Sequence, residues 1–140
     1  MRQDIRTMIA SNRFCVLATV ADGAPHCSLM SYISSDDCRE LYMATQKNTK
    51  KYANLINNPT VSLLIDSRHS EGRVRALTIT GSCLQALPAE KKLGLRRQLI
   101  DRHPDLKVLL DDEKTDIVAV RVRALQLLDG VLDTYYEEVP

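Results

Sequence analysis

A basic segment near the middle of the chain has the residue types of an anion-binding site. Residues 45–51 read Thr-Gln-Lys-Asn-Thr-Lys-Lys and lie where a predicted strand runs into a predicted helix. The first N–H groups of a helix have no intrahelical acceptor, and its dipole is positive at that end, so a phosphate is favoured there. No acidic residue occurs among the 25 residues between Glu40 and Asp66. These features leave two interpretations open, a solvated basic helix start and a phosphate site.

Other residues that carry chemistry are scattered. The three histidines, His26, His69 and His103, are far apart, and the four cysteines form no Cys-x-x-Cys pair, so neither a metal site nor a disulfide scaffold is expected. The acidic residues 111–113 lack EF-hand spacing and favour a solvated loop. No GxSxG, GxGxxG or GxxxxGK[ST] motif occurs, which argues against the hydrolase, dinucleotide and nucleoside-triphosphate folds that use them.

The composition excludes several classes of protein. With 140 residues, 44% of them hydrophobic, the chain is long enough to bury a core as one domain spanning residues 1–140. A net charge of +1 and few aromatic residues argue against a nucleic-acid partner. No apolar run approaches the length of a membrane span, and residues 1–4 do not begin a secretory signal. We therefore expect a cytoplasmic protein with no membrane partner.

The periodicity of apolar residues predicts the elements that position the basic segment. Helical spacing occurs in three stretches: 3–12, 48–57 and 88–102. One further helical turn is predicted at residues 106–110. Strand-like stretches are more numerous: 14–20, 26–34, 41–45, 60–66, 74–87, 117–123 and 124–132. A polar loop is predicted at residues 67–72, and Gly81 predicts a bulge or a close approach within its strand. Strands joined by short turns, with helices between some of them, indicate a mainly β (α+β) small barrel with helical inserts.

Five ordered motifs carry a resemblance to a known family. They are FCVLATV at 14–20, DGAPH at 22–26, LYMAT at 41–45, TKKYANL at 49–55 and NNPTVSLL at 57–64. Together they resemble the pyridoxamine 5′-phosphate oxidase-like family of FMN-binding split barrels, over roughly residues 5–87. The resemblance implies a six-stranded antiparallel split β-barrel that forms a homodimer, with FMN in a cleft at the subunit interface.

The resemblance also implies which residues hold the cofactor. Residues 28–31 would line the isoalloxazine ring, the strand end at 44–45 would continue the site, and the basic pair at the start of the next helix would hold the phosphate. The cofactor-binding residues expected in this way are Ser28, Leu29, Met30, Ser31, Ala44, Thr45, Thr49, Lys50 and Lys51. No residue is identified as a catalytic acid or base, and flavin hydride transfer need not use one.

Departures from the family pattern bear on the reaction. Ser28 and Ala76 stand where the vitamin-making oxidases carry Arg and Gln, and residues 135–140 lack their Arg- and His-containing tail, so pyridoxamine phosphate oxidation is not the expected activity. The expected function is an FMN-dependent oxidoreductase with a small-molecule substrate and NADH or NADPH as candidate reductants. The alternatives are a non-catalytic flavin or haem carrier or sensor, with His26 and His69 as candidate axial ligands, and an interaction domain with an empty cleft.

Overall fold

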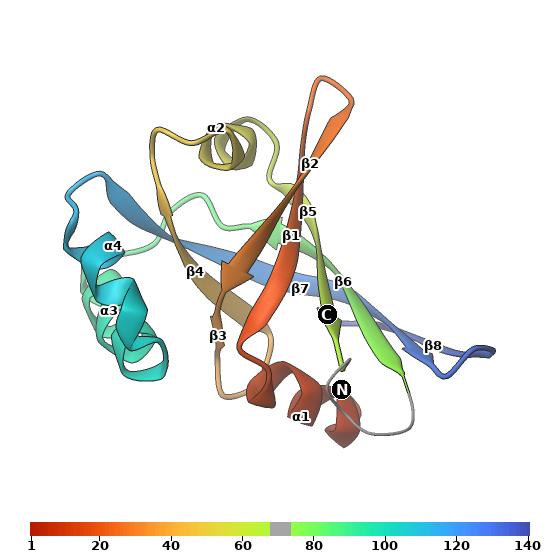
Figure 1. The fold of residues 1–140 in the computed structure, drawn as a ribbon. Helices are drawn as coiled ribbons and strands as arrows, with labels where there is room; N and C mark the ends of the chain where they lie inside the picture. The colour runs from red at the N-terminus through yellow and green to blue at the C-terminus, as the bar shows by residue number, and fades with distance from the viewer. Residues whose placement is uncertain (68–73) are drawn as a thin grey trace.

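A curled antiparallel β-sheet forms most of the protein (Figure 1). The computed structural model describes residues 1–67 and 74–140, so most of the predicted loop 67–72, with His69, lies outside the described residues. The strands of the described part are β1 (Phe14–Ala21), β2 (Ala24–Ser31), β3 (Ile33–Ser34), β4 (Glu40–Gln46), β5 (Thr60–Asp66), β6 (Arg75–Cys83), β7 (Thr115–Asp129) and β8 (Asp133–Glu138). Their order in the sheet is β2-β1-β5-β6-β7-β4-β3, with β8 paired to β7.

The helices confirm the three predicted helical stretches and the further turn. They are α1 (Gln3–Ser11), α2 (Lys50–Asn57), α3 (Ala89–Arg102), the 3₁₀ turn η1 (Pro104–Leu106) and α4 (Lys107–Asp111). Within the residues that the structure describes, no helix has the length and hydropathy required to cross a membrane.

The chain itself closes the sheet into a half-barrel. β2 and β3 are separated only by Tyr32, yet they lie at opposite ends of the strand order. The sheet must therefore curl until its two edges come close, and β2 does approach β4 across this opening. This architecture confirms the mainly β fold with helical inserts and is consistent with a split barrel. The described part has eight strand segments rather than the expected six, because β3 and β8 are additional short or terminal strands.

The predicted strand pair 117–123 and 124–132 is wrong, since residues 115–129 form one continuous strand, β7. The cause is a β-bulge: Thr80 pairs with Ala124 but Gly81 pairs with Val122, which leaves Arg123 as an extra residue. A bulge shifts the alternation of buried and exposed side chains by one residue. In the sequence, this single strand therefore has the alternation expected of two consecutive strands. The alternative predicted for Gly81, a close approach, is confirmed, because a Cβ there would lie 2.5 Å from Val120 Cγ1, while the bulged residue itself lies on β7.

Two apolar clusters lie on opposite faces of the sheet. The larger one fills the inside of the half-barrel, where α1 and α2 add Ile5, Ile9 and Leu55 to the inward side chains of the strands. The smaller one lies outside, where Leu95 and Leu99 of α3 cover β4 and the first half of β7. α3 and α4 lie beside β4 and β3 in Figure 1, and in this view none of the described helices lies over the middle of β2, β1, β5 and β6.

Candidate functional site

The start of α2 leaves backbone donors free. Thr49 is the N-cap residue, and its hydroxyl accepts a hydrogen bond from the Tyr52 N–H at 3.3 Å while donating one to the Gln46 carbonyl at 2.8 Å. Within the described residues, the N–H groups of Lys50 and Lys51 have no acceptor. These two hydrogen bonds fix the Thr49 side chain. The predicted polar contact between Thr49 and the cofactor would therefore have to use the same hydroxyl oxygen that caps the helix.

Two cationic side chains flank these free donors. Lys50 is exposed and Lys51 is half-buried, and neither forms an ion pair with any described residue. The segment is less isolated from acids in space than in sequence. The Gln46 side-chain amide donates a hydrogen bond to Asp112 at 3.3 Å. Glu113 and Lys47 line the same open cavity, which has a volume of about 480 Å³. The unpaired positive charge therefore lies on the helix side of the segment, at Lys50 and Lys51.

Asp116 of β7 forms hydrogen bonds with both α2 and α3 near the start of α2. It accepts hydrogen bonds from the Tyr52 hydroxyl at 3.0 Å and from Lys92 Nζ at 2.8 Å. Burial would raise the pKa of Asp116, but the hydrogen bonds from Lys92 and Tyr52 stabilise the carboxylate and outweigh burial, so the pKa is lowered. Because Asp116 pairs with Thr45 across β4 and β7, the hydrogen bond from Tyr52 attaches α2 to the end of β4, and the ion pair with Lys92 attaches α3 there.

A buried hydrogen bond attaches α2 to β1, the strand next to the edge strand β2. The Asn54 side-chain amide donates to the Thr19 hydroxyl at 3.1 Å, and both residues are buried. Thr19 pairs with His26, only two residues before Ser28 on β2. β1 therefore connects α2 with the β2 segment.

The predicted ring-lining segment of β2 presents side chains to both faces of the sheet. Met30 is buried in the barrel interior, and Ser28 has the same inward orientation. Leu29 and Ser31 point outward, where Leu29 pairs with Val16 and is 73% exposed. The four residues therefore do not form one side-chain surface, and what they share is the backbone edge of β2.

The side chains of the two predicted site residues of β4 are buried in the single chain. Ala44 is buried, and Thr45 is 2% exposed with its hydroxyl 3.4 Å from that of Thr49. The structure thus brings Thr45 together with the helix cap. At this strand end, a ligand could therefore reach the backbone but not the buried Thr45 side chain.

Two strand edges without strand partners oppose each other at the opening of the half-barrel. β2 is bonded to β1 on one side only, and β3 covers β4 only at Leu41 and Tyr42. Among the described strands, none pairs with the remaining edge of β4 at residues 43–45. Backbone N–H and C=O groups on such edges can bond a polar heterocycle, and α2 lies next to the same opening.

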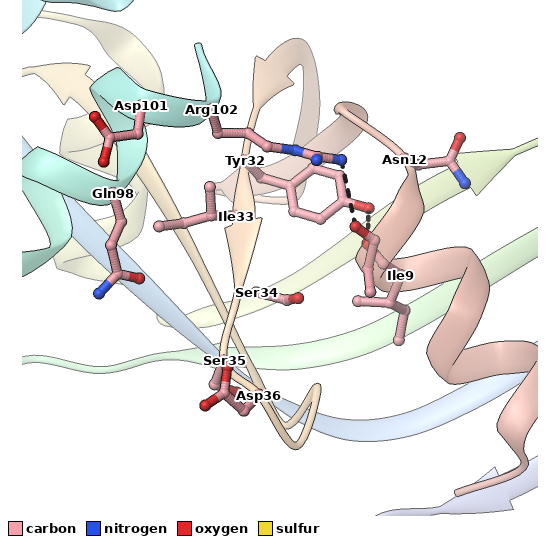
Figure 2. Close-up of a pocket in the computed structure, with 11 residues that line it drawn as sticks. Ile9, Asn12, Tyr32, Ile33, Ser34, Ser35, Asp36, Gln98, Asp101 and Arg102 are labelled. Atoms are coloured by element: carbon pink, nitrogen blue, oxygen red, sulfur yellow. Dashed lines mark hydrogen bonds between the residues drawn. The ribbon is translucent and has the colours of Figure 1, made fainter.

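A second cavity, of about 550 Å³, was not predicted from the sequence. It lies between the end of α1, β3 and α3 (Figure 2), and none of the predicted site residues lines it. The Tyr32 hydroxyl donates to the Ile9 carbonyl at 2.5 Å, and the Arg102 guanidinium donates to the Ala10 carbonyl at 3.3 Å, so these groups hold the wall together. Three segments far apart in sequence form it, and no local motif marks it.

Solved structures with the same fold differ in what their names say they bind. A haem-binding protein from Mycobacterium smegmatis superposes with a TM-score of 0.83 at 20% identity, over 97% of this chain and 57% of that chain. A FAD-binding protein from Mesorhizobium loti superposes with a TM-score of 0.74 at 19% identity, over 96% and 93%. At these identities the likeness establishes the fold alone.

Sequence comparison identifies the family. A curated relative, a Schizosaccharomyces pombe homologue of pyridoxamine 5′-phosphate oxidase, is 34% identical over 44% of this chain. The chain spans only 36% of that relative's length. The family profile described as pyridoxamine 5′-phosphate oxidase matches residues 1–129, almost the whole chain. The protein therefore belongs to the pyridoxamine 5′-phosphate oxidase family.

Proposed function

We propose that this protein binds FMN and acts as a flavin-dependent oxidoreductase. The observation that carries the proposal is the start of α2, where two N–H groups without acceptors adjoin the side chains of Lys50 and Lys51, which have no ion-pair partner among the described residues. A phosphate monoester fits this donor set, because its oxygens accept from backbone N–H groups and its charge is complementary to both lysines and the helix dipole.

The ring of the flavin fits the adjoining strand edges. Its pyrimidine portion carries N–H and C=O groups that match the unpartnered backbone edges of β2 and β4. The outward side chains of Leu29 and Ser31 supply an apolar and a polar contact beside that edge. This arrangement would use the backbone of residues 28–31 and 44–45, in keeping with the burial of Thr45.

A homodimer would complete the site. In the described part of the chain, the outer face of β1, β2, β5 and β6 carries exposed or half-exposed apolar side chains, including Phe14, Val16, Leu29 and Leu64. Apolar surface of this kind on a small protein is typical of an interaction site. The face includes Leu29 beside the proposed ring site, so a second copy would cover the flavin and exclude water from it.

The chain's own residues would bind and orient the cofactor, and the flavin, when bound, would supply hydride transfer between a nicotinamide donor and a small-molecule acceptor. Lys50 and Lys51 would hold the phosphate, the edge of β2 would hold the ring, and the second copy would shield it. The proposed reaction is not pyridoxamine phosphate oxidation. The resemblance described above places Gln and Arg of the vitamin-making oxidases at positions 76 and 28, and this chain has the outward-facing Ala76 and Ser28 there.

Haem binding is the second candidate, favoured by the structural likeness to the haem-binding protein from Mycobacterium smegmatis. Of the two histidines in the described residues, His103 is buried with its Nε2 bonded to the Tyr32 carbonyl at 2.8 Å. Only the half-buried His26, on β2 near the opening, is accessible as an axial ligand. Within the described residues, haem binding therefore depends on His26, and the other candidate, His69, lies outside them.

The visible absorption spectrum of the purified protein separates these functions. We expect the two visible-region bands of oxidised flavin and their bleaching by NADH or NADPH under anaerobic conditions. An intense Soret band that disappears in His26→Ala would establish haem binding instead. A colourless protein that takes up neither added FMN nor added haem would contradict both functions.

A further inference from the structure

The two oxygens of the Asp116 carboxylate bond two different helices. Oδ2 accepts from the Tyr52 hydroxyl at 3.0 Å, and Oδ1 accepts from Lys92 Nζ at 2.8 Å. The Ile117 N–H also donates to Oδ1, at 2.9 Å, so Oδ2 is left to Tyr52. Tyr52 is the third residue of α2, and Lys92 is the fourth residue of α3. One carboxylate at the start of β7 therefore holds the first turns of both helices.

Tyr52 connects this carboxylate to the donors of the proposed phosphate site. Its ring packs against the larger apolar cluster, and its hydroxyl is fixed by Asp116. The N–H groups of Lys50 and Lys51, which have no acceptor among the described residues, immediately precede it. A helix as short as α2 has little stability of its own. The contacts of its third residue therefore set the direction of the free N–H groups before it.

The position of Lys92 is unfavourable for α3 itself. The N-terminal end of a helix dipole is positive, so a cation in the first turn is disfavoured. Lys92 lies in the first turn of α3 and is half-buried, with its charge paired to Asp116. The ion pair offsets this disfavoured position, and the same carboxylate bonds α2. The lysine therefore contributes to the arrangement around Asp116 more than to its own helix.

We propose that Tyr52 and Lys92 are positioning residues that set the preference of the α2 start for a phosphorylated flavin. The charge-assisted bond from Lys92 holds Asp116 in the orientation that accepts from Tyr52, and Tyr52 in turn holds the first turn of α2. Neither side chain is assigned a contact with the phosphate. The inference rests on the proposed function and adds that α3, outside the sheet, controls phosphate recognition at α2.

The ratio of the dissociation constants for riboflavin and FMN measures this preference in the full chain. The two ligands share the ring, so a general loss of stability weakens both, whereas a misdirected helix start weakens FMN alone. Tyr52→Phe keeps the packed ring and removes only the hydroxyl. Lys92→Met keeps the aliphatic stem and removes the charge. Each variant is expected to lower the ratio at least about threefold through the lost hydrogen bond, with riboflavin affinity unchanged.

Lys91→Met is the matched control for Lys92→Met. Lys91 is exposed at the preceding position of α3 and forms no ion pair with any described residue, and its Nζ lies over the Tyr42 ring, 5.5 Å from the centroid. Loss of the same charge there is expected to leave the ratio within about twofold of the wild-type value, because solvent and salt screen it. Lys92→Arg keeps the ion pair with Asp116 and should retain most of the preference.

The Tyr52→Phe background separates positioning from direct attraction of the phosphate. Without the Tyr52 hydroxyl, Asp116 no longer bonds α2, so Lys92→Met and Lys91→Met should then have the same effect on the ratio. A Lys92→Met effect that persists undiminished in this background, or that Lys91→Met reproduces in the wild-type chain, would overturn the inference and leave the proposed function standing. A wild-type chain with equal affinities for riboflavin and FMN would overturn the phosphate site on which both depend.

Discussion

The Asn54 side chain donates a hydrogen bond to the Thr19 hydroxyl at 3.1 Å, and both groups are buried between α2 and β1. α2 has only eight residues, so it would not be stable alone and depends on such tertiary contacts. The proposed phosphate site lies at the first residues of this helix. The buried pair therefore fixes the orientation of the donors that would hold the ligand.

Replacing Asn54 should weaken both the fold and the ligand site. Asn54→Ala leaves the Thr19 hydroxyl without its partner in a buried position, and we expect a loss of about 1–3 kcal/mol in the free energy of unfolding. FMN affinity should fall as well, because α2 is released from β1. Urea unfolding and FMN titration measure the two effects. The control is Asn57→Ala at the exposed end of the same helix, and equal effects from both variants would contradict the role of the buried pair.

Removing the basic pair should weaken FMN binding with little change in stability. Each charge-assisted contact contributes roughly 1.5–3 kcal/mol, so Lys50→Ala/Lys51→Ala should raise the FMN dissociation constant at least tenfold. The matched control, Arg97→Ala/Lys107→Ala, removes the same net charge from exposed positions on α3 and α4. Unchanged FMN affinity in a folded Lys50→Ala/Lys51→Ala protein would show that the phosphate lies elsewhere.

The cap at Thr49 allows a graded test of the helix start. Thr49→Ala removes the acceptor for the Tyr52 N–H and the donor to the Gln46 carbonyl, and should cost about 1 kcal/mol of unfolding free energy. Thr49→Ser keeps the hydroxyl and should restore most of this stability. Thermal unfolding of the three proteins makes the comparison, and a serine variant as unstable as the alanine variant would exclude capping as the cause.

The ion pair at Asp116 predicts a pH dependence of stability. Because hydrogen bonds hold its pKa in the folded protein below the ordinary value of 3.8, the carboxylate stabilises the fold above that pH. This contribution is lost as the pH falls through the lower, folded-state pKa. Asp116→Asn should therefore cost about 1–2 kcal/mol near neutral pH, and the difference from wild type should shrink in acid.

Urea unfolding across the acid range measures this difference for Asp116→Asn. Asp105→Asn, at an exposed position in η1, serves as the control and should follow the wild-type curve. A difference between Asp116→Asn and wild type that stays constant down to strong acid would rule out the ionised carboxylate as its source.

Local patterns predicted most elements of this fold, because their signals are carried by neighbouring residues. The helix before Asn58-Pro59 and the hairpin at Asp22-Gly23 are of this kind, and Asp22 and Gly23 both have positive φ in the turn. The error at residues 123–124 has a different origin. The bulge at Arg123 depends on the approach of Gly81 to Val120 from another strand, and no local pattern records such a partner.

The candidate site was predicted in part for the same reason. The anion preference of the α2 start follows from residues 45–51, and the structure confirms a helix that begins at Lys50 with a threonine cap. The burial of Thr45, the nearness of Glu113 to Lys47 and the opposed edges of β2 and β4 result from long-range packing. The acid-free stretch in the sequence therefore overstated how far the lysines are from negative charge.

The most direct test of the central claim is the ratio of the dissociation constants for riboflavin and FMN, measured by quenching of flavin fluorescence. The two ligands share the ring and differ in the phosphate that the start of α2 would hold. We expect FMN to bind at least tenfold more tightly than riboflavin, and Lys50→Ala/Lys51→Ala to bring the ratio close to one. Equal affinities in the wild-type protein, or a preference for FMN that survives the loss of both lysines, would contradict a phosphate site at this helix.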